Sequence, residues 1–312
     1  MRAVLAVYAL AMAASGCAEL GVVTDGSSVA YGKPNGGYLI DGRKLPDKGD
    51  GYTTREVWAE RGNRYGTDEL VTLVKGVAKR MHRKVKDVRL VVADLSSTTG
   101  GAAHAFHRSH QNGRDADLLY YMRDAEGKPF EADAMHVFNA RGVAADGTGI
   151  SVDIPRTWLL VKELLTADEA YVQYIFMYRP IVEKILEYAV ANHEPPELIA
   201  RAQMACKQPG DSAPHNDHMH VRVYCAATDR QFGCVDIGPL ELLAERETEQ
   251  QKVMAAIAES LPKQPDPAAN AVAVETRPAT AADVWAASSE ATSAGTLSST
   301  QAASFGALLR AR

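Results

Sequence analysis

The sequence has little cysteine, no excess of basic residues and, beyond its N-terminus, no long apolar run. A net charge of −5 gives no general attraction to nucleic acid, so we expect no nucleic-acid partner. No apolar segment after the N-terminus approaches the roughly 18 residues of a membrane-spanning helix. With 312 residues, 46% of them hydrophobic, the chain has the length and composition of one large or two modest globular domains.

The N-terminal segment "MRAVLAVYALAMAASGCAELG" is typical of a bacterial export signal. Arg2 precedes an apolar run, and the small residues at 14–16 stand before Cys17 as in a lipobox. We therefore expect residues 1–17 to be a signal peptide and Cys17 to be lipidated, with a plain cleaved signal as the alternative. Several acyl chains on one cysteine anchor a protein stably. Ala18 follows the cysteine, which favours the outer membrane and a periplasmic location.

The remaining three of the four cysteines would lie in an oxidising compartment, where disulfides persist. Cys225 and Cys234 flank a short polar loop, so we expect them to pair. Cys206 has no evident partner, because spacing alone does not give connectivity.

Composition divides the chain into five segments. After the signal, residues 18–37 are rich in glycine and serine and predict a flexible tether. Residues 38–240 form the single folded domain, and 241–261 form a possible helix. Residues 262–312 are rich in Ala, Ser and Thr with few large apolar side chains, so we expect a disordered tail.

Within the domain, helical and strand patterns are mixed. Apolar residues at helical spacing over 67–84, with Thr67 as N-cap, predict a helix. Further helices are expected from Pro155 and from Pro180, since proline suits a first helical turn. Short β-branched or alternating runs predict strands at 88–96, 115–122, 171–177 and 218–225. The mixture favours an α+β fold with an antiparallel sheet.

Five of the nine histidines lie in two short runs, "HRSHQNGRDADLLYY" (107–121) and "APHNDHMHVRVYC" (213–225). On a strand, His218, His220 and Arg222 would share one face, opposite an apolar face that packs on the core. Gly113 allows the loop that carries His110 to turn back onto the strand that carries Asp117.

If the two strands are neighbours, one loop histidine, one carboxylate and one strand histidine converge. Three protein ligands with an open fourth position are typical of a catalytic zinc site. The alternative for a single such His–Asp pair is an ordinary surface hydrogen bond, but two clusters with ligand spacing favour a metal. Asp115 shares the face of Asp117 and either orients a ligand histidine or forms a plain salt bridge.

The stretches "SHQNGRDADLL" and "HNDHMHVRVYC" resemble the penicillin-insensitive murein endopeptidases, which are grouped with lysostaphin-type enzymes, D-Ala-D-Ala metallopeptidases and the hedgehog domain. The resemblance extends over about 38–237 and includes "VVADLSSTTGG" and "YIFMYRPI". It implies Zn²⁺ held by His110, Asp117 and His220, with His218 as a catalytic non-ligand and His215 supporting it. The implied reaction is hydrolysis of D-alanyl to diaminopimelyl crosslinks in bacterial peptidoglycan.

The family pattern also implies a second metal or substrate site, for which His107 and Asp146 match two positions. Gly149 stands where a histidine is expected, so the second metal is in doubt. Two other functions fit the same cleft. One is a D,D-carboxypeptidase or dipeptidase that trims stem peptides, although a Glu is often found where His218 stands. The other is a non-catalytic lipoprotein that only binds peptidoglycan.

Overall fold

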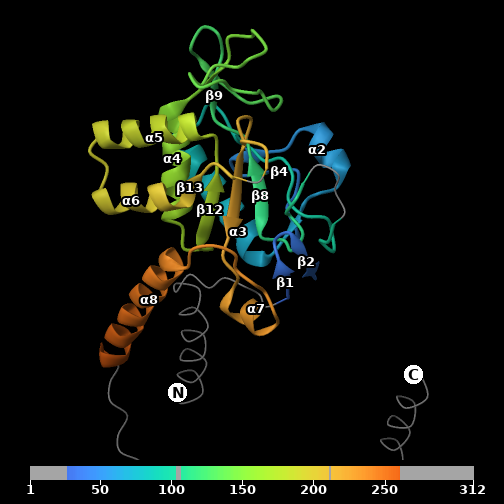
Figure 1. The fold of residues 1–312 in the computed structure, drawn as a ribbon, viewed down its shortest axis with the longest axis vertical. Helices are drawn as coiled ribbons and strands as arrows, with labels where there is room; N and C mark the ends of the chain where they lie inside the picture. Colours follow the sequence, from blue (N-terminus) through green and yellow to red (C-terminus); the bar gives the residue numbers. More distant parts are fainter. Residues whose placement is uncertain (1–26, 103–106, 211, 261–312) are drawn as a thin grey trace, which may run out of the picture. The chain divides into compact units, whose positions relative to one another are not determined.

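The computed structural model describes residues 27–102, 107–210 and 212–260 (Figure 1). One compact unit extends to Ala255, and of the second unit only residues 256–260 are described. The predictions for the signal segment, Cys17 and the tail 262–312 therefore lie outside the described residues. The compact unit is a mixture of helices and small sheets, as the α+β prediction required.

A four-stranded sheet forms the centre of the compact unit. Its strands are β8 (Asp115–Leu118), β12 (Val172–Phe176), β13 (Cys206–Lys207) and β14 (Met219–Val223). Their order is β13-β12-β14-β8. β14 is antiparallel to both of its neighbours, whereas β13 runs parallel to β12. The two histidine-bearing segments thus meet on the adjacent strands β8 and β14.

The two faces of β14 differ as its alternating sequence predicts. Met219, Val221 and Val223 are almost fully buried in the hydrophobic core, so the side chains between them face the other side of the sheet. Across the strand pair, His220 stands opposite Asp117 and Arg222 opposite Asp115. Polar residues from two strands therefore share one face.

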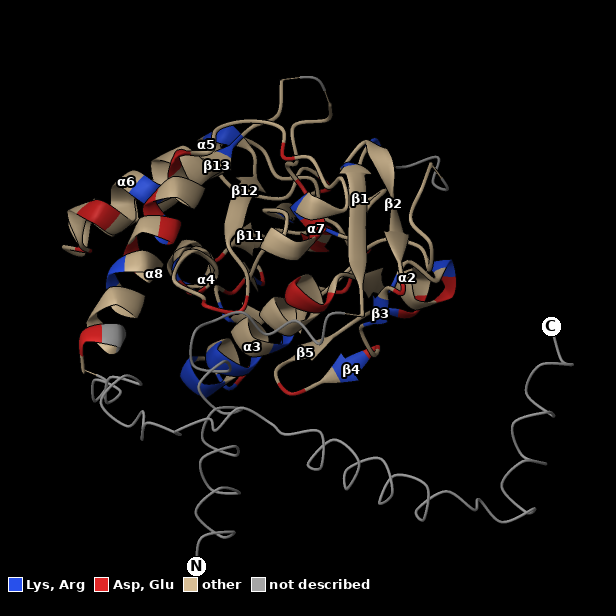
Figure 2. Cartoon of the chain, turned by 90° about the horizontal axis from the view of Figure 1, so that it is seen from below, with Lys and Arg blue, Asp and Glu red and all other residues tan. Residues whose placement is uncertain are grey.

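Helices supply a large part of the remaining core. These are α3 (Asp68–Lys84), α4 (Ile154–Leu165), α5 (Arg179–Ala191) and α6 (Pro196–Ala205). The Thr67 hydroxyl caps α3 by accepting from the Leu70 N–H at 3.4 Å, and the basic last turn of α3 suits the negative end of the helix dipole (Figure 2). α4 contacts α3, α5 and α6, and α6 contacts β12. The helices expected from the sequence are confirmed, and α6 is an addition.

The tether predicted for 18–37 is wrong for its described C-terminal part. Residues from Val29 onward form a β-hairpin of β1 (Val29–Lys33) and β2 (Gly36–Ile40), joined by Pro34 and Asn35. Ala30 is fully buried against the two cysteines near the C-terminal end of the domain, and its N–H donates to Asp229 at 2.8 Å. Buried and exposed residues alternate along β2, a strand pattern that the high glycine content obscured.

The remaining elements are short or peripheral. Of the strand predicted at 88–96, only β7 (Leu90–Val91) is formed. The strand predicted at 115–122 ends at Leu118, and β9 (Met122–Arg123) begins four residues later. The predicted helix at 241–261 is α8 (Glu241–Ser260). The others are β3 (Arg43–Lys44), β4 (Lys48–Gly49), β5 (Tyr52–Thr53), β6 (Tyr65–Gly66), β10 (Pro129–Phe130), β11 (Ser151–Val152), α2 (Glu56–Arg61) and α7 (Ala227–Gln231). Among the described helices, none combines the length and apolarity needed to cross a bilayer.

The disulfide prediction is confirmed. Cys225 and Cys234 are bonded, with their Cα atoms 6.0 Å apart. Cys206 is a buried free thiol whose pKa is raised to about 12 by desolvation. It is therefore an inert core residue at neutral pH.

Candidate metal centre

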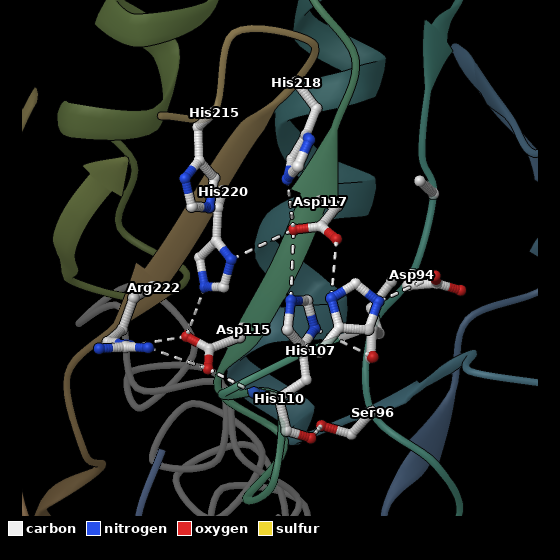
Figure 3. Close-up of polar contacts among 12 residues, drawn as sticks. Asp94, Ser96, His107, His110, Asp115, Asp117, His215, His218, His220 and Arg222 are labelled. Carbon is white, nitrogen blue, oxygen red and sulfur yellow. Dashed lines mark hydrogen bonds and ion pairs between the residues drawn. The ribbon is translucent and has the colours of Figure 1, made fainter. Parts of the chain in front are cut away.

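The centre forms where β8 and β14 pair. Asp117 is fully buried and His220 is 5% exposed, and they face each other across the strand pair (Figure 3). His110 lies in the loop that leads into β8, and His218 immediately precedes β14 rather than lying on it. Figure 3 shows the side chains of both segments directed at one another.

Asp117 lies at the middle of the arrangement. Its Oδ1 atom is 3.2 Å from His110 Nε2, 3.3 Å from His220 Nδ1 and 3.4 Å from His218 Nε2. The rings of His110 and His220 are 4.6 Å apart between centroids. Imidazole nitrogens from two distant segments thus surround one buried carboxylate oxygen.

The loop that carries His110 is held in a constrained conformation. His110 has a φ of +66°, which is unusual for a residue with a Cβ. The Ser96 hydroxyl donates to the His110 carbonyl at 2.5 Å and accepts from the Gly113 N–H at 3.0 Å. Gly113 has a φ of +78°, and a Cβ there would lie 2.6 Å from Leu39 Cδ1. The turn predicted at Gly113 therefore exists, and it requires glycine.

Two histidine rings are oriented by backbone carbonyls. His110 Nδ1 donates to the Leu95 carbonyl at 3.0 Å, because a carbonyl oxygen can only accept. His215 Nδ1 donates in the same way to the Ala213 carbonyl at 2.8 Å. In a neutral ring the other nitrogen then carries a lone pair, so His110 presents Nε2 to Asp117 in the form that binds a metal.

Two other rings are oriented by carboxylates. His218 Nδ1 lies 2.7 Å from Asp217 Oδ1, and His107 Nε2 lies 3.0 Å from Asp94 Oδ2. In each case the carboxylate accepts, so the opposite nitrogen is directed toward the centre. For His107 this nitrogen is 3.7 Å from Asp117 Oδ2.

Asp115 connects two of the predicted ligands. It is fully buried, and its Oδ2 accepts from the backbone N–H of His110 at 2.9 Å. Its Oδ1 lies 3.2 Å from His220 Nε2 and accepts from Arg222 Nε at 2.7 Å. The salt-bridge alternative raised by the sequence is confirmed, and Asp115 also faces the candidate ligand His220.

The close packing of these charged and titratable groups shifts their pKa values. Burial opposes ionisation of Asp117, but His110 and His218 hold its pKa well below the ordinary value. Burial also opposes protonation of His218, yet Asp117 and Asp217 raise its pKa to about 10. For His215 burial dominates and lowers the pKa to about 4, with help from His220 and His218. His215 is consequently neutral at pH 7.

The residues fit a metal ion. His110 Nε2 and both carboxylate oxygens of Asp117 are buried and make no hydrogen bond of acceptable geometry with any described residue. Leaving such atoms unsatisfied costs about 1–3 kcal/mol each, which a bound cation would offset. Two separate sets of ligand atoms could each hold an ion: His215, His218 and His220, and His107, His110 and Asp117. The predicted ligands His110, Asp117 and His220 draw on both sets.

The two residues suggested for a second site are placed differently. His107 belongs to the cluster, and its ring centroid is 4.4 Å from that of His110. Asp146 instead contacts His136 Nδ1 at 2.7 Å and the Thr148 hydroxyl at 2.6 Å, and it belongs to neither set of ligand atoms.

Sequence reasoning missed the orienting residues Asp94, Ser96 and Asp217. Asp94 and Ser96 end the β-branched run at 88–96, where polar residues follow a buried strand. Asp217 immediately precedes His218, and an acidic neighbour of a candidate catalytic histidine was the available signal. All three are positioned by contacts that only the folded chain brings together.

The centre opens into a cleft of about 850 Å³. His107, His110, His215, His218 and His220 line it, together with the aromatic residues Tyr174 and Phe176. Phe176 lies edge-on to His220 at 5.5 Å between centroids. A cleft of this size accommodates a peptide-sized ligand beside the candidate metal ligands.

Fold and site together define an α+β protein with a His–Asp cluster, open to a cleft, that can hold a metal ion. A family model described as penicillin-insensitive murein endopeptidase matches residues 30–286, and the chain belongs to that family. A penicillin-insensitive murein endopeptidase of Haemophilus influenzae is 27% identical over 208 residues, which cover 65% of this chain and 66% of the relative. The chain thus spans just under two thirds of that relative. Proteins of the same name are 25% identical in Klebsiella pneumoniae, over 69% of this chain and 72% of the relative, and in Pectobacterium atrosepticum, over 65% and 66%.

Proposed function

We propose that this chain is a zinc-dependent endopeptidase that hydrolyses D-alanyl to diaminopimelyl crosslinks in bacterial peptidoglycan, with His110, Asp117 and His220 as ligands. The observation that carries the proposal is the convergence of imidazole nitrogens from two segments on the buried Asp117 carboxylate. The names of the relatives support murein as the substrate. Imidazole with carboxylate suits zinc, whereas calcium and magnesium prefer oxygen ligands alone.

When bound, zinc would polarise a scissile carbonyl and make water more acidic. The chain supplies the proton transfer. Asp217 fixes the ring of His218 so that Nε2 faces the centre. Because the pKa of His218 is raised to about 10, this nitrogen starts protonated, would donate its proton to the leaving amine and would recover one from water. The same nitrogen, when protonated, stabilises the developing oxyanion. His215, which stays neutral, packs against His218 with 4.9 Å between ring centroids and limits its movement.

The test combines metal analysis with digestion of crosslinked muropeptide dimers. The purified protein should contain about one zinc per chain and convert dimers to monomers, and a chelator should abolish the conversion. His110→Ala, Asp117→Ala and His220→Ala should each lose the metal and at least about a hundredfold in activity. His193→Asn is the matched control, because His193 is exposed, lies outside the cleft lining and has a φ of +55° that asparagine tolerates.

His218→Ala should retain the metal and lose roughly 10²–10⁴-fold in kcat. A parallel fall in metal content would make His218 a ligand and contradict its catalytic role. Full activity in any of the three ligand variants would contradict the ligand assignment. Removal of terminal residues without loss of dimers would identify a carboxypeptidase, and retention of intact dimers without any product would identify a binding protein.

We further propose a periplasmic location, with lipidated Cys17 anchoring the protein to the outer membrane. Peptidoglycan lies next to that membrane, so a tethered hydrolase would meet its substrate directly. The pairing of Cys225 with Cys234 supports export, because disulfides persist in the periplasm.

A further inference from the structure

One row of side chains crosses the central sheet from its edge to the candidate metal centre. Lys207 on β13 is the register partner of Phe176, Phe176 is the partner of His220, and His220 is the partner of Asp117. Neighbouring strands are about 4.8 Å apart, so the Lys207 backbone is roughly 10 Å from that of His220. The row places the backbone of a lysine two strands away from that of His220.

Aromatic rings fill the space between the cation and the centre. Tyr174 and Phe176, here called the aromatic wall, stack with 4.8 Å between centroids. Lys207 Nζ lies 5.5 Å from the centroid of Tyr174. All three side chains line the cleft that contains the histidines. An apolar wall excludes water and strengthens the attraction between a cleft cation and an anionic ligand.

Lys207 has no charged partner among the described residues, unlike two arginines of the same cleft. Arg222 is paired with Asp115, and Arg61 is paired with Asp94 at 2.7 Å. The Lys207 side chain is exposed, yet its backbone is fixed, since its carbonyl accepts from the Met177 N–H at 2.9 Å. Its ammonium group, which lies beside the Tyr174 ring, is therefore available to a ligand in the cleft.

We propose that Lys207 and Tyr174 form a subsite that binds a free carboxylate of the peptide substrate. This inference rests on the proposed function and specifies which substrate feature the cleft selects. An extended peptide advances about 3.3–3.6 Å per residue, so the carboxylate lies two to three residues from the scissile bond. Lys207 is a specificity-determining residue that acts on binding and takes no part in proton transfer.

The test uses the full chain and two forms of one crosslinked dimer, with its free carboxylates intact or converted to amides. For the unchanged protein we expect the KM to rise about three- to fivefold on amidation, the range of a solvent-accessible ion pair. Lys207→Met should raise the KM for the carboxylate form to the same extent, leave kcat unchanged and abolish the discrimination. Lys207→Arg, which keeps the positive charge, should retain the discrimination between the two forms. Lys86→Met is the matched control, since Lys86 is exposed and lies outside the cleft lining.

Equilibrium binding of both dimers to chelator-treated protein gives the same comparison without turnover. If the unchanged protein binds the carboxylate form more tightly but cleaves neither form, the proposed function fails while the subsite stands. If Lys207→Met discriminates between the two forms as the unchanged protein does, in KM and in Kd, the subsite is wrong while the hydrolase assignment stands. A fall in kcat at unchanged KM in Lys207→Met would also contradict the subsite.

Discussion

Replacing Asp115 with asparagine should separate the positioning of the ligands from the stability of the fold. Asparagine keeps an oxygen that can accept from the His110 N–H, but it removes the negative charge that faces His220 Nε2 at 3.2 Å and Arg222 Nε at 2.7 Å. A carboxylate behind a metal-bound histidine raises its basicity and fixes its ring, and its loss typically weakens metal binding 10–100-fold. We therefore expect the affinity for the proposed zinc ion to fall by about that factor.

Stability should fall in the same variant for a different reason. Asp115 is fully buried, and the Arg222 side chain is only 11% exposed, so the change leaves a largely buried cation without its partner. Breaking a buried pair costs about 3–5 kcal/mol, and we take about 3 kcal/mol because Arg222 also lies over the Phe176 ring. For a unit of this size that corresponds to a fall in Tm of roughly 6–12 °C.

The control is a double-mutant cycle with Arg222→Gln. That single variant should lose stability and change zinc affinity less than about threefold. Because the double variant contains neither charge, it should recover much of the lost stability and keep the weak zinc binding. Competition with a chromophoric chelator measures the affinity, and thermal melts followed by circular dichroism measure the stability. Wild-type zinc affinity in Asp115→Asn, or recovery of both properties in the double variant, would refute a positioning role for Asp115.

Two further predictions concern the pH dependence of stability and the location. Glu163, which is buried and contacts Arg80 and Lys84, has a pKa held below the ordinary value because these two cations outweigh its desolvation. The ionised Glu163 should contribute fully to the free energy of unfolding above its unfolded pKa of about 4.3, and this contribution should be lost as the pH falls through the folded pKa. Glu163→Gln should therefore cost about 1–2 kcal/mol of stability at pH 7 and little near pH 2. A stability difference in urea denaturation that does not change with pH would contradict this. Cys17→Ser should move the protein from the outer-membrane fraction to the soluble periplasm, and an unchanged membrane fraction would show that lipidation is not the anchor.

Sequence patterns predicted the helices and strands that are determined by residues close together in the sequence. The helix at 68–84 follows from its apolar spacing and from the Thr67 cap, and the alternation in "HMHVRVYC" gave the two faces of β14. The hairpin from Val29 to Ile40 was missed because its glycines, with the serines just before it, suggested a tether. Its stability derives from tertiary contacts, such as the buried Ala30, that no local pattern reports.

The candidate site likewise contains residues that the sequence suggested and residues that only the fold reveals. Residue type and spacing were enough to propose His110, Asp117 and His220, which the fold brings close together, because metal ligands need particular donor atoms. Some of the residues that orient these side chains are far from them in the sequence and contact them only in the folded chain. Ser96 reaches the His110 carbonyl across 14 positions, and Arg222 reaches Asp115 across 107. Such partners have no sequence signature of their own, because serines, aspartates and arginines occur on any surface.

The orienting contacts also explain how a crowded set of imidazoles can serve metal binding without rearrangement. Each of the five rings in the cleft has one nitrogen directed at an oxygen of the surrounding chain: a carbonyl for His110 and His215, and a carboxylate for His107, His218 and His220. Every carboxylate used in this way is distinct from Asp117, whose oxygens make no hydrogen bond of acceptable geometry with any residue that the structure describes. Ring orientation is thereby set by the folded chain, and the opposite nitrogens of His107, His110, His218 and His220 lie 3.2–3.7 Å from the Asp117 carboxylate. Because little side-chain entropy is left to lose, the free energy of binding goes mainly into coordination, and a cation entering this centre would change the surrounding fold little.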